Sequence, residues 1–243
     1  QFCVYLSVLG DVLFHPSSLD QPAIDDLAAI FEMEMYPTLI GGTALLGSLI
    51  RGNKKGLAVA DIATEADLDR LTSFGDVVVM ESGVNAAGNL VVCNDHGAVV
   101  SSVIPGPGAE MIGEVLGVEA IRSKVAGEDT VGSLLVANNK GVLAHPDIHA
   151  EEANRIQEAM QVPVNDPMLL IPAMASVTEH LGFAFTSSVL QAHPFTFARQ
   201  LSTLDHLTKG RVAWNVVTSY LPNAGTNLGF EGLPTHEERY GRA

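Results

Sequence analysis

The sequence predicts an α/β protein in two parts. The first part repeats a unit of a β-hairpin followed by a helix, and the second has the order helix, strand, helix, strand. A Gly is followed six residues later by Asn and nine residues later by Gly at three places, starting at Gly47, Gly88 and Gly132. Chance produces such a match on the order of once in five thousand starting points. The character of the sequence changes after Val164, where the repeats end.

Each repeat has the pattern of a hairpin, because two short apolar runs flank a polar turn that contains Asn and Gly. In the first example Leu49-Ile50 precedes the turn at 53–56 and Leu57-Ala58-Val59 follows it. A helix is expected after each hairpin. One begins after the capping residue Thr64, and the others cover 108–116 and 149–160.

A degenerate fourth copy precedes these three. Val12-Leu13-Phe14-His15-Pro16 mirrors Val142-Leu143-Ala144-His145-Pro146, and residues 24–31 supply its helix. Equivalent points lie 45, 41 and 44 residues apart, at His15, Ala60, Ser101 and His145. This period indicates units that bury their faces on their neighbours, in an open array or a closed ring. The small residues around each hairpin favour the ring.

The second part starts at Asn165. Asp166 and Pro167 predict the start of a helix that runs to Leu181, with Gly182 as its stop and Pro172 either kinking it or marking its true start. A strand is expected over 183–188, a second helix from His193-Pro194 to Lys209-Gly210, and a second strand over 211–219. This order predicts parallel strands with crossover helices.

The composition excludes several classes of protein. With 47% apolar and 17% charged residues in 243, the chain can form a globular core. No apolar run reaches the ~18 residues of a membrane span. Its two cysteines, Cys3 and Cys93, exclude a disulfide framework and a zinc site of paired cysteines. We expect a cytoplasmic protein without a metal or membrane contact.

The negative charge is concentrated in the first part. Residues 1–164 carry 22 acidic and 8 basic residues, a net −14, whereas residues 165–243 carry 6 and 5, a net −1. An acidic surface repels phosphate backbones, so direct wrapping of nucleic acid is disfavoured. On a nucleoprotein, the first part is expected to contact the basic proteins.

From about Cys3 to Val164 the chain resembles the translation initiation factor 6 family of archaea and eukaryotes. The resemblance implies a pentein, a ring of five such units, of which four are present here. It also implies binding of the large ribosomal subunit, which blocks joining of the small one, and a role in subunit maturation. The motifs that carry it follow in order at family spacing: Ile40-Gly41-Gly42-Thr43-Ala44-Leu45-Leu46-Gly47, Asn85-Ala86-Ala87-Gly88-Asn89-Leu90-Val91-Val92-Cys93-Asn94-Asp95, Thr130-Val131-Gly132-Ser133, Asn138-Asn139-Lys140-Gly141, His145-Pro146 and Gln161-Val162-Pro163.

The second part resembles flavin-dependent monooxygenases of the bacterial luciferase superfamily, in particular the branch acting on nitrilotriacetate and dibenzothiophene sulfone. The motifs are Glu179-His180-Leu181-Gly182-Phe183, His193-Pro194-Phe195, Ser202-Thr203-Leu204-Asp205-His206-Leu207-Thr208-Lys209-Gly210-Arg211 and Trp214-Asn215-Val216-Val217-Thr218-Ser219-Tyr220. The family has an eight-stranded TIM-type barrel, whose site lies at the C-terminal ends of the strands. The resemblance implies that reduced flavin mononucleotide (FMN) would contact Thr186, Ser187, Asn215, Thr218 and Ser219. Two of eight strands cannot enclose a flavin, so no activity is expected.

A partner interface is predicted at Ser48, Asn89 and Ser133, which follow the three repeated glycines. These polar residues recur at one end of each hairpin, so a closed ring would place them on one face; the alternative is a solvated turn. The glycines themselves are expected to allow close packing of strands.

No catalytic residue is predicted. Cys93 beside His96 suggests a nucleophile, since some penteins modify guanidines with Cys, His and carboxylates, but Cys93 ends an apolar strand and fits a small packed residue better. His15 and His145 precede Pro, which favours a turn over metal binding. In the second part His193, Asp205 and His206 are expected as helix-cap and surface residues, and Trp214 as a core residue.

We therefore predict two domains, an incomplete pentein-like domain at 1–164 and a luciferase-like monooxygenase fragment at 165–243. Val164 is interpreted as the junction of two gene fragments. The leading function is binding of the large ribosomal subunit through its ribosomal proteins, without catalysis and without a cofactor. The alternative is an FMN-dependent monooxygenase.

Overall fold

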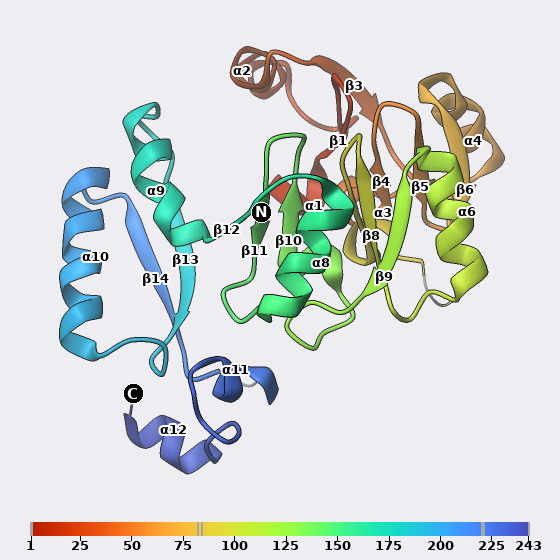
Figure 1. Cartoon of the computed structure of the whole chain (residues 1–243). Helices are drawn as coiled ribbons and strands as arrows, with labels where there is room; N and C mark the ends of the chain where they lie inside the picture. Colours follow the sequence, from red (N-terminus) through yellow and green to blue (C-terminus); the bar gives the residue numbers. More distant parts are fainter. Residues whose placement is uncertain (1, 82, 84, 220–221, 243) are drawn as a thin grey trace. The chain divides into compact units, whose positions relative to one another are not determined.

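The computed structural model describes residues 2–81, 83, 85–219 and 222–242 (Figure 1). The chain divides into two compact units. Unit 1 comprises Gln1–Lys124, Asp129–Val142 and Arg155–Pro163, and unit 2 comprises Val125–Glu128, Leu143–Asn154 and Val164–Ala243. Among the described residues no helix is long and apolar enough to cross a membrane.

One element order recurs along the chain: a four-residue helix, a strand, a second strand, a longer helix and a third strand. We call each such set a repeat. The first is α1 (Phe2–Tyr5), β1 (Ser7–Leu9), β2 (Val12–Pro16), α2 (Gln21–Phe31) and β3 (Glu34–Thr38). The second is α3 (Leu46–Leu49), β4 (Ile50–Gly52), β5 (Gly56–Val59), α4 (Glu65–Leu71) with the 3₁₀ turn η1 (Thr72–Phe74), and β6 (Asp76–Val79).

The third repeat is α5 (Ala87–Leu90), β7 (Val91–Cys93), β8 (Gly97–Ser101), α6 (Gly106–Leu116) and β9 (Glu119–Ser123). The fourth is α7 (Val131–Leu134), β10 (Leu135–Ala137), β11 (Val142–Ala144), α8 (Ala150–Met160) and β12 (Val164–Asn165), with the sheet order β10-β11-β12. In each of the first three sheets the first two strands are antiparallel and the third is parallel to the second.

The predicted hairpins and longer helices are confirmed, but the sequence did not predict the four-residue helices or the third strands. The short helices have no capping side chain, so they lack the usual start signal. The helix predicted over 108–116 starts two residues earlier, at Gly106, with Pro107 in its first turn. Proline is tolerated there because the first N–H groups of a helix have no partner within it.

In unit 1 the longer helix of a repeat packs on the sheet of the repeat before it. Helix α6 contacts β5 and β6 (Figure 1), and its residues Ile112 and Leu116 share a core with Ala58 and Val78 of the second repeat. Likewise, Phe74 of the second repeat packs on Phe14 in the sheet of the first repeat. The ring of Phe14 lies 5.4 Å from that of Tyr36 and 4.9 Å from that of Phe74.

In the second and third repeats, the Asn of the hairpin turn joins its repeat to the next. Asn53 closes its own turn, because its Oδ1 accepts hydrogen bonds from the backbone N–H groups of Lys55 (2.9 Å) and Gly56 (3.3 Å). Its Nδ2 donates to two carbonyl groups of the third repeat, those of Asn94 (3.0 Å) and Leu116 (2.9 Å). One side chain therefore fixes a turn and links it to a helix end.

Asn94 repeats this arrangement one step later. Its Nδ2 donates to the carbonyl groups of Asn138 (3.2 Å) and Met160 (2.9 Å), and both Asn53 and Asn94 are only 4% exposed. Asn138 closes its own turn in the same way, but it is exposed, and among the described residues none accepts a hydrogen bond from its Nδ2.

Most of unit 2 follows the predicted order of helix, strand, helix, strand. Strands β13 and β14 are parallel, with Phe183 opposite Val212 and Ser188 opposite Val217. Trp214 is half-buried; it packs on Phe197 at 4.6 Å between ring centroids, which agrees with its predicted place in the core. The elements are α9 (Pro167–Ser176), β13 (Phe183–Ser188), α10 (Pro194–Thr208), β14 (Val212–Val217), α11 (Pro222–Asn227) and α12 (His236–Arg242).

Helix α9 ends at Ser176 instead of the predicted Leu181, with Pro172 inside it. Side chains donate hydrogen bonds to the last carbonyl groups of this helix. Ser176 and Thr178 donate to the carbonyl groups of Ala173 and Met174. A third donor, the Arg211 guanidinium, binds the next carbonyl group of the helix at 3.1 Å. The sequence could not reveal this, because Arg211 lies far along the chain.

We expect Asn94→Ala to lower the free energy of unfolding by about 2–4 kcal/mol, because it leaves buried N–H and carbonyl groups without partners. Asn138→Ala is the matched control and should cost about 1 kcal/mol or less, since that turn is in contact with water. Urea unfolding followed by circular dichroism measures both values. Equal losses in the two variants would contradict a linking role for Asn94.

Candidate functional site

The four-residue helices of successive repeats lie against one another in unit 1. Helix α3 contacts α1 on one side and α5 on the other, and α5 contacts α7. We call these four helices the short-helix row. Each of the last three contributes one polar residue at its third position, namely Ser48, Asn89 and Ser133.

Backbone contacts hold the short-helix row together. A Cβ atom on Gly88 would lie 1.9 Å from the Gly47 carbonyl oxygen, and one on Gly132 would lie 2.1 Å from the Gly88 carbonyl oxygen. No other residue fits at that distance. The predicted close packing is therefore present at Gly88 and Gly132, but the prediction is wrong in one respect, because it joins helices and not strands.

The predicted interface residues are neighbours in this row. The Cα of Ser48 lies 3.0 Å from the Cβ position of Gly88, and the carbonyl carbon of Asn89 lies 3.0 Å from that of Gly132. Ser48 and Asn89 are half-buried and Ser133 is exposed. Among the described residues none forms a hydrogen bond with any of these three side chains. They lie in helices before the hairpins, and not at the hairpin ends as expected; their interface role stays a prediction.

Arg51 was not singled out from the sequence. It lies in β4, and its Nη2 donates to the Gly88 carbonyl group at 3.0 Å. This carbonyl group belongs to α5, so a cation of the second repeat contacts the short helix of the third. The only available signal was a single charge between apolar residues of the hairpin.

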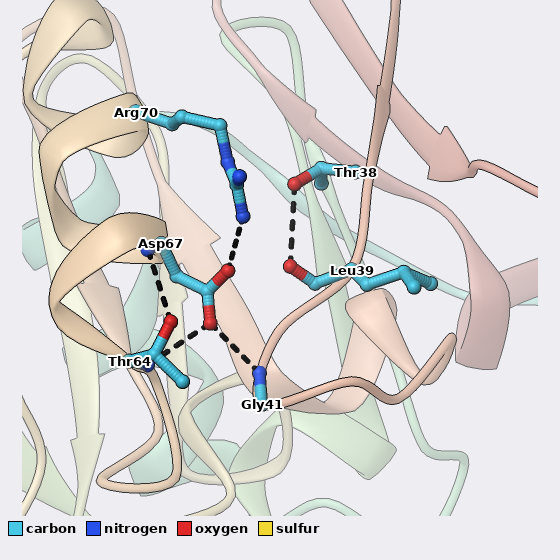
Figure 2. A network of polar contacts seen from close by, with 6 residues as sticks. All are labelled: Thr38, Leu39, Gly41, Thr64, Asp67 and Arg70. Carbon is cyan, nitrogen blue, oxygen red and sulfur yellow. Dashed lines mark hydrogen bonds and ion pairs between the residues drawn. The ribbon is translucent and has the colours of Figure 1, made fainter.

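A carboxylate positions the loop that leads into α3 (Figure 2). Asp67 lies in α4, and its Oδ2 accepts hydrogen bonds from the N–H groups of Gly41 (2.9 Å) and Thr64 (2.9 Å). Arg70 pairs with the other oxygen. Gly41 has φ +56°, and a Cβ there would lie 2.4 Å from the Ile62 carbonyl oxygen, so this loop needs glycine.

The pKa of Asp67 reflects these contacts. Burial raises the pKa of the carboxyl group, but the hydrogen bonds from Gly41 and Thr64 and the charge of Arg70 together outweigh burial, so the pKa lies below its ordinary value. The sequence predicted Thr64 as the cap of this helix, which is confirmed by its hydrogen bond from the Asp67 N–H. It did not predict the link to Gly41.

Cys93, which the sequence suggested as a possible nucleophile, is not activated. Burial raises the pKa of Cys93 to about 12, with a smaller opposing effect from Arg51. Its thiol therefore stays protonated at neutral pH, and a thiol is a poor nucleophile. This agrees with the interpretation of Cys93 as a small packed residue at the end of β7.

Of the two histidines before proline, His145 lies at a turn as expected, but the turn prediction is wrong for His15, which lies in strand β2. His145 Nδ1 accepts a hydrogen bond from the Asp147 N–H at 3.2 Å, and burial lowers the pKa of His145. His15 is buried, with its Nδ1 3.0 Å from the Pro16 carbonyl oxygen. Within the described part of the chain, no group of three or more His, Cys, Asp or Glu residues could hold a metal ion.

Three of the predicted flavin contacts lie on the paired strands of unit 2. Asn215 Nδ2 donates to Thr186 Oγ1 at 3.2 Å, so the structure brings these two together. Ser187 Oγ donates to Gln191 Oε1 at 2.7 Å. Gln191 was missed by the sequence analysis, because a single polar residue in a loop gives no pattern.

The other two follow β14. Thr218 is half-buried, and Ser219 is buried with φ +62°. Ser219 Oγ has no hydrogen-bond partner among the described residues. Residues 220–221, which follow directly, lie outside the described part of the chain.

The chain matches two protein families. Residues 1–167 match the model of the eIF-6 family, and residues 149–243 match the model of luciferase-like monooxygenases. Both resemblances predicted from the sequence are confirmed, and so is the composite nature of the chain.

Individual relatives show the same division. Translation initiation factor 6 of Methanoculleus marisnigri is 33% identical over 161 residues, which is 66% of this chain and 73% of that protein. Long-chain alkane monooxygenase of Geobacillus thermodenitrificans is 60% identical over 85 residues, which is 35% of this chain and 19% of that protein. Dimethyl-sulfide monooxygenase of Hyphomicrobium sulfonivorans is 51% identical over 108 residues, which is 44% of this chain and 22% of that protein. The chain thus spans about a fifth of the two monooxygenases.

Among solved structures, the crystal structure of long-chain alkane monooxygenase (LadA) matches with a TM-score of 0.32 and 56% identity. The matched region covers 37% of this chain and 21% of the monooxygenase chain.

We expect Gly88→Ala to lower the free energy of unfolding by about 3 kcal/mol or more, because the added methyl group overlaps a backbone carbonyl oxygen. Gly106→Ala is the control, since a Cβ at Gly106 meets nothing within 4 Å. Urea unfolding measures both. A stable Gly88→Ala protein would contradict the close contact between α3 and α5.

We expect Asp67→Asn to cost about 1–3 kcal/mol of stability at pH 7. The pKa of Asp67 is lowered by folding, so its contribution is present above the unfolded pKa of about 3.9 and is lost as the pH falls through the lower folded value. The difference between the wild type and Asp67→Asn should therefore shrink below about pH 4.

Thermal unfolding from pH 7 to pH 3 tests this, with the exposed Asp69→Asn as a control that leaves stability unchanged. A difference that is independent of pH would contradict a charged Asp67.

Proposed function

The chain belongs to the eIF-6 family, and on this premise we propose that it binds the large ribosomal subunit. Binding prevents premature joining of the small subunit and serves subunit maturation in the cytoplasm. The observation that carries the proposal is the family match over residues 1–167. Relatives named translation initiation factor 6 at 33–38% identity support it.

We infer that the four repeats form part of a five-membered ring, the pentein arrangement. The short-helix row supports this inference, because α1, α3, α5 and α7 follow one another in direct contact. Each step at Gly88 and Gly132 uses the same glycine-to-carbonyl approach. Equal steps between equal units build a curved array, and such an array can close on itself.

The partner surface that we propose is the face of the short-helix row with Ser48, Asn89 and Ser133. Their side chains have no hydrogen-bond partners among the described residues, so they can bond to another molecule without losing an internal contact. The surrounding part of the chain has a net charge of −14 over residues 1–164. Opposite charge favours binding to basic ribosomal proteins over the RNA phosphates.

A second candidate function is an FMN-dependent monooxygenase, favoured by 60% identity to long-chain alkane monooxygenase over 85 residues. Three of the five predicted flavin contacts take part in hydrogen bonds, whereas Ser219 Oγ has no partner among the described residues. Asn215 is bonded to Thr186, and Ser187 to Gln191, so these groups are already satisfied by one another. We therefore propose that the chain has no cofactor and no catalytic activity.

We expect the purified chain to pellet with isolated large ribosomal subunits, while FMN added to the same tubes keeps its free fluorescence. Ser133→Glu should weaken binding about tenfold, because it places a carboxylate on the proposed contact face. Asn89→Asp should weaken it in the same direction. The control Ala66→Glu adds the same charge at an exposed site of α4 and should bind as the wild type does.

A chain that stays in the supernatant would overturn ribosome binding. Quenched FMN fluorescence without pelleting would favour the monooxygenase. If the wild type pellets and the Ser133→Glu and Ala66→Glu variants pellet to the same extent, the contact lies on another face.

A further inference from the structure

The boundary between the two compact units does not coincide with the boundary between the two families. Of the two family models, residues 125–148 match only that of the eIF-6 family, and residues 168–243 match only that of the luciferase-like monooxygenases. Nevertheless Val125–Glu128 and Leu143–Asn154 belong to unit 2, together with everything that follows Val164. Unit 2 is therefore composed of residues from both families, and contacts inside it join the two.

One hydrogen bond within unit 2 joins Gln191 of the luciferase-like segment to Asp147. Gln191 Oε1 accepts hydrogen bonds from the Ser187 hydroxyl group (2.7 Å) and from the Ser188 N–H (3.0 Å). Because a backbone N–H can only donate, the amide oxygen must face Ser188, and the amide nitrogen is left for another acceptor. That nitrogen, Nε2, donates to Asp147 Oδ1 at 3.0 Å. Gln191 is thus oriented by the end of β13 and binds a residue of the eIF-6-like sequence.

Asp147 lies in the turn that follows β11 and is only 6% exposed. The turn has a defined backbone, because the Asp147 N–H donates to His145 Nδ1 and the Ile148 N–H donates to the His145 carbonyl group. A buried carboxylate requires hydrogen-bond donors, and Gln191 supplies one of them. The turn therefore depends on a side chain that lies 44 residues further along the chain.

An apolar contact within unit 2 supports the same docking. Ala126 and Ala224 are both 0% exposed and share one apolar cluster, against which Leu233 packs. Ala126 lies in the loop before α7, and its N–H donates to Glu152 Oε2, which also accepts from the His149 N–H. Ala224 belongs to α11 of the luciferase-like segment. A second contact thus joins the sequences of the two families.

We propose that residues 165–243 dock on the loop 125–128 and the turn 145–149, and fold with them as one cooperative unit. The Asp147–Gln191 hydrogen bond and the contact between Ala126 and Ala224 hold the docked segment in place. The luciferase-like segment then has a structural role, as a cover for eIF-6-like residues, and this role needs no flavin. The inference does not depend on ribosome binding.

Hydrogen exchange of the full chain, followed by mass spectrometry, tests the proposal. The Asp147 and Ile148 amides are hydrogen-bonded, so their exchange reports the opening of the turn. Gln191→Glu places a second carboxylate against that of Asp147, and it should raise the equilibrium constant for opening at residues 145–149 at least about tenfold. Residues 212–217 of β14 should open more often by the same factor, because a cooperative unit opens as a whole. Gln200→Glu, the same change at an exposed site of α10, is the control and should exchange as the wild type does.

An exchange of the two groups separates a lost contact from a damaged fold. When Asp147→Asn is combined with Gln191→Glu, the amide at 147 can donate to the carboxylate at 191, whose other oxygen still accepts from Ser188. The double variant should therefore return to within about threefold of the wild-type exchange. Gln191→Glu without effect at residues 145–149 would overturn the proposal. So would an effect that Asp147→Asn does not relieve, or a turn that opens independently of β14.

Discussion

The approach of one backbone to another in the short-helix row is the constraint on which unit 1 depends. The Gly47 carbonyl oxygen lies only 1.9 Å from the position that a Cβ at residue 88 would take, and the Gly88 carbonyl oxygen lies 2.1 Å from the corresponding position at Gly132. This approach fixes the distance between neighbouring repeats. The sheets, the helices packed between them and the hairpin turns must then all fit that spacing.

Asparagine is suited to the hairpin turns because it carries an acceptor and a donor on one short side chain. The acceptor of Asn94 holds its turn through the N–H groups of His96 and Gly97, and the donor reaches two carbonyl groups of the fourth repeat. A carboxylate would present a second acceptor to those carbonyl groups. A buried polar group is thus satisfied on every side, which makes its burial acceptable.

Local signals predicted local structure well. The spacing of Asn and Gly located the hairpins, Thr64 and Asp166 located helix starts, and the strand predicted over 183–188 coincides with β13. The short helices could not be predicted, because tertiary contacts at Gly88 hold them and not capping residues. The same holds for contacts that join distant residues, such as Asp67 with Gly41 and Arg211 with the end of α9. The sequence located the polar residues of the proposed site, but not the helices that carry them.

The linking hydrogen bonds of Asn53 and Asn94 span 41 to 66 residues, and each reaches only the adjacent repeat. Cooperativity in unit 1 must then pass from neighbour to neighbour, as in a linear array. The second and third repeats have a neighbouring repeat on both sides, so we expect their amide hydrogens to exchange most slowly. We expect the first and fourth repeats, each of which adjoins one described repeat, to be less protected from exchange.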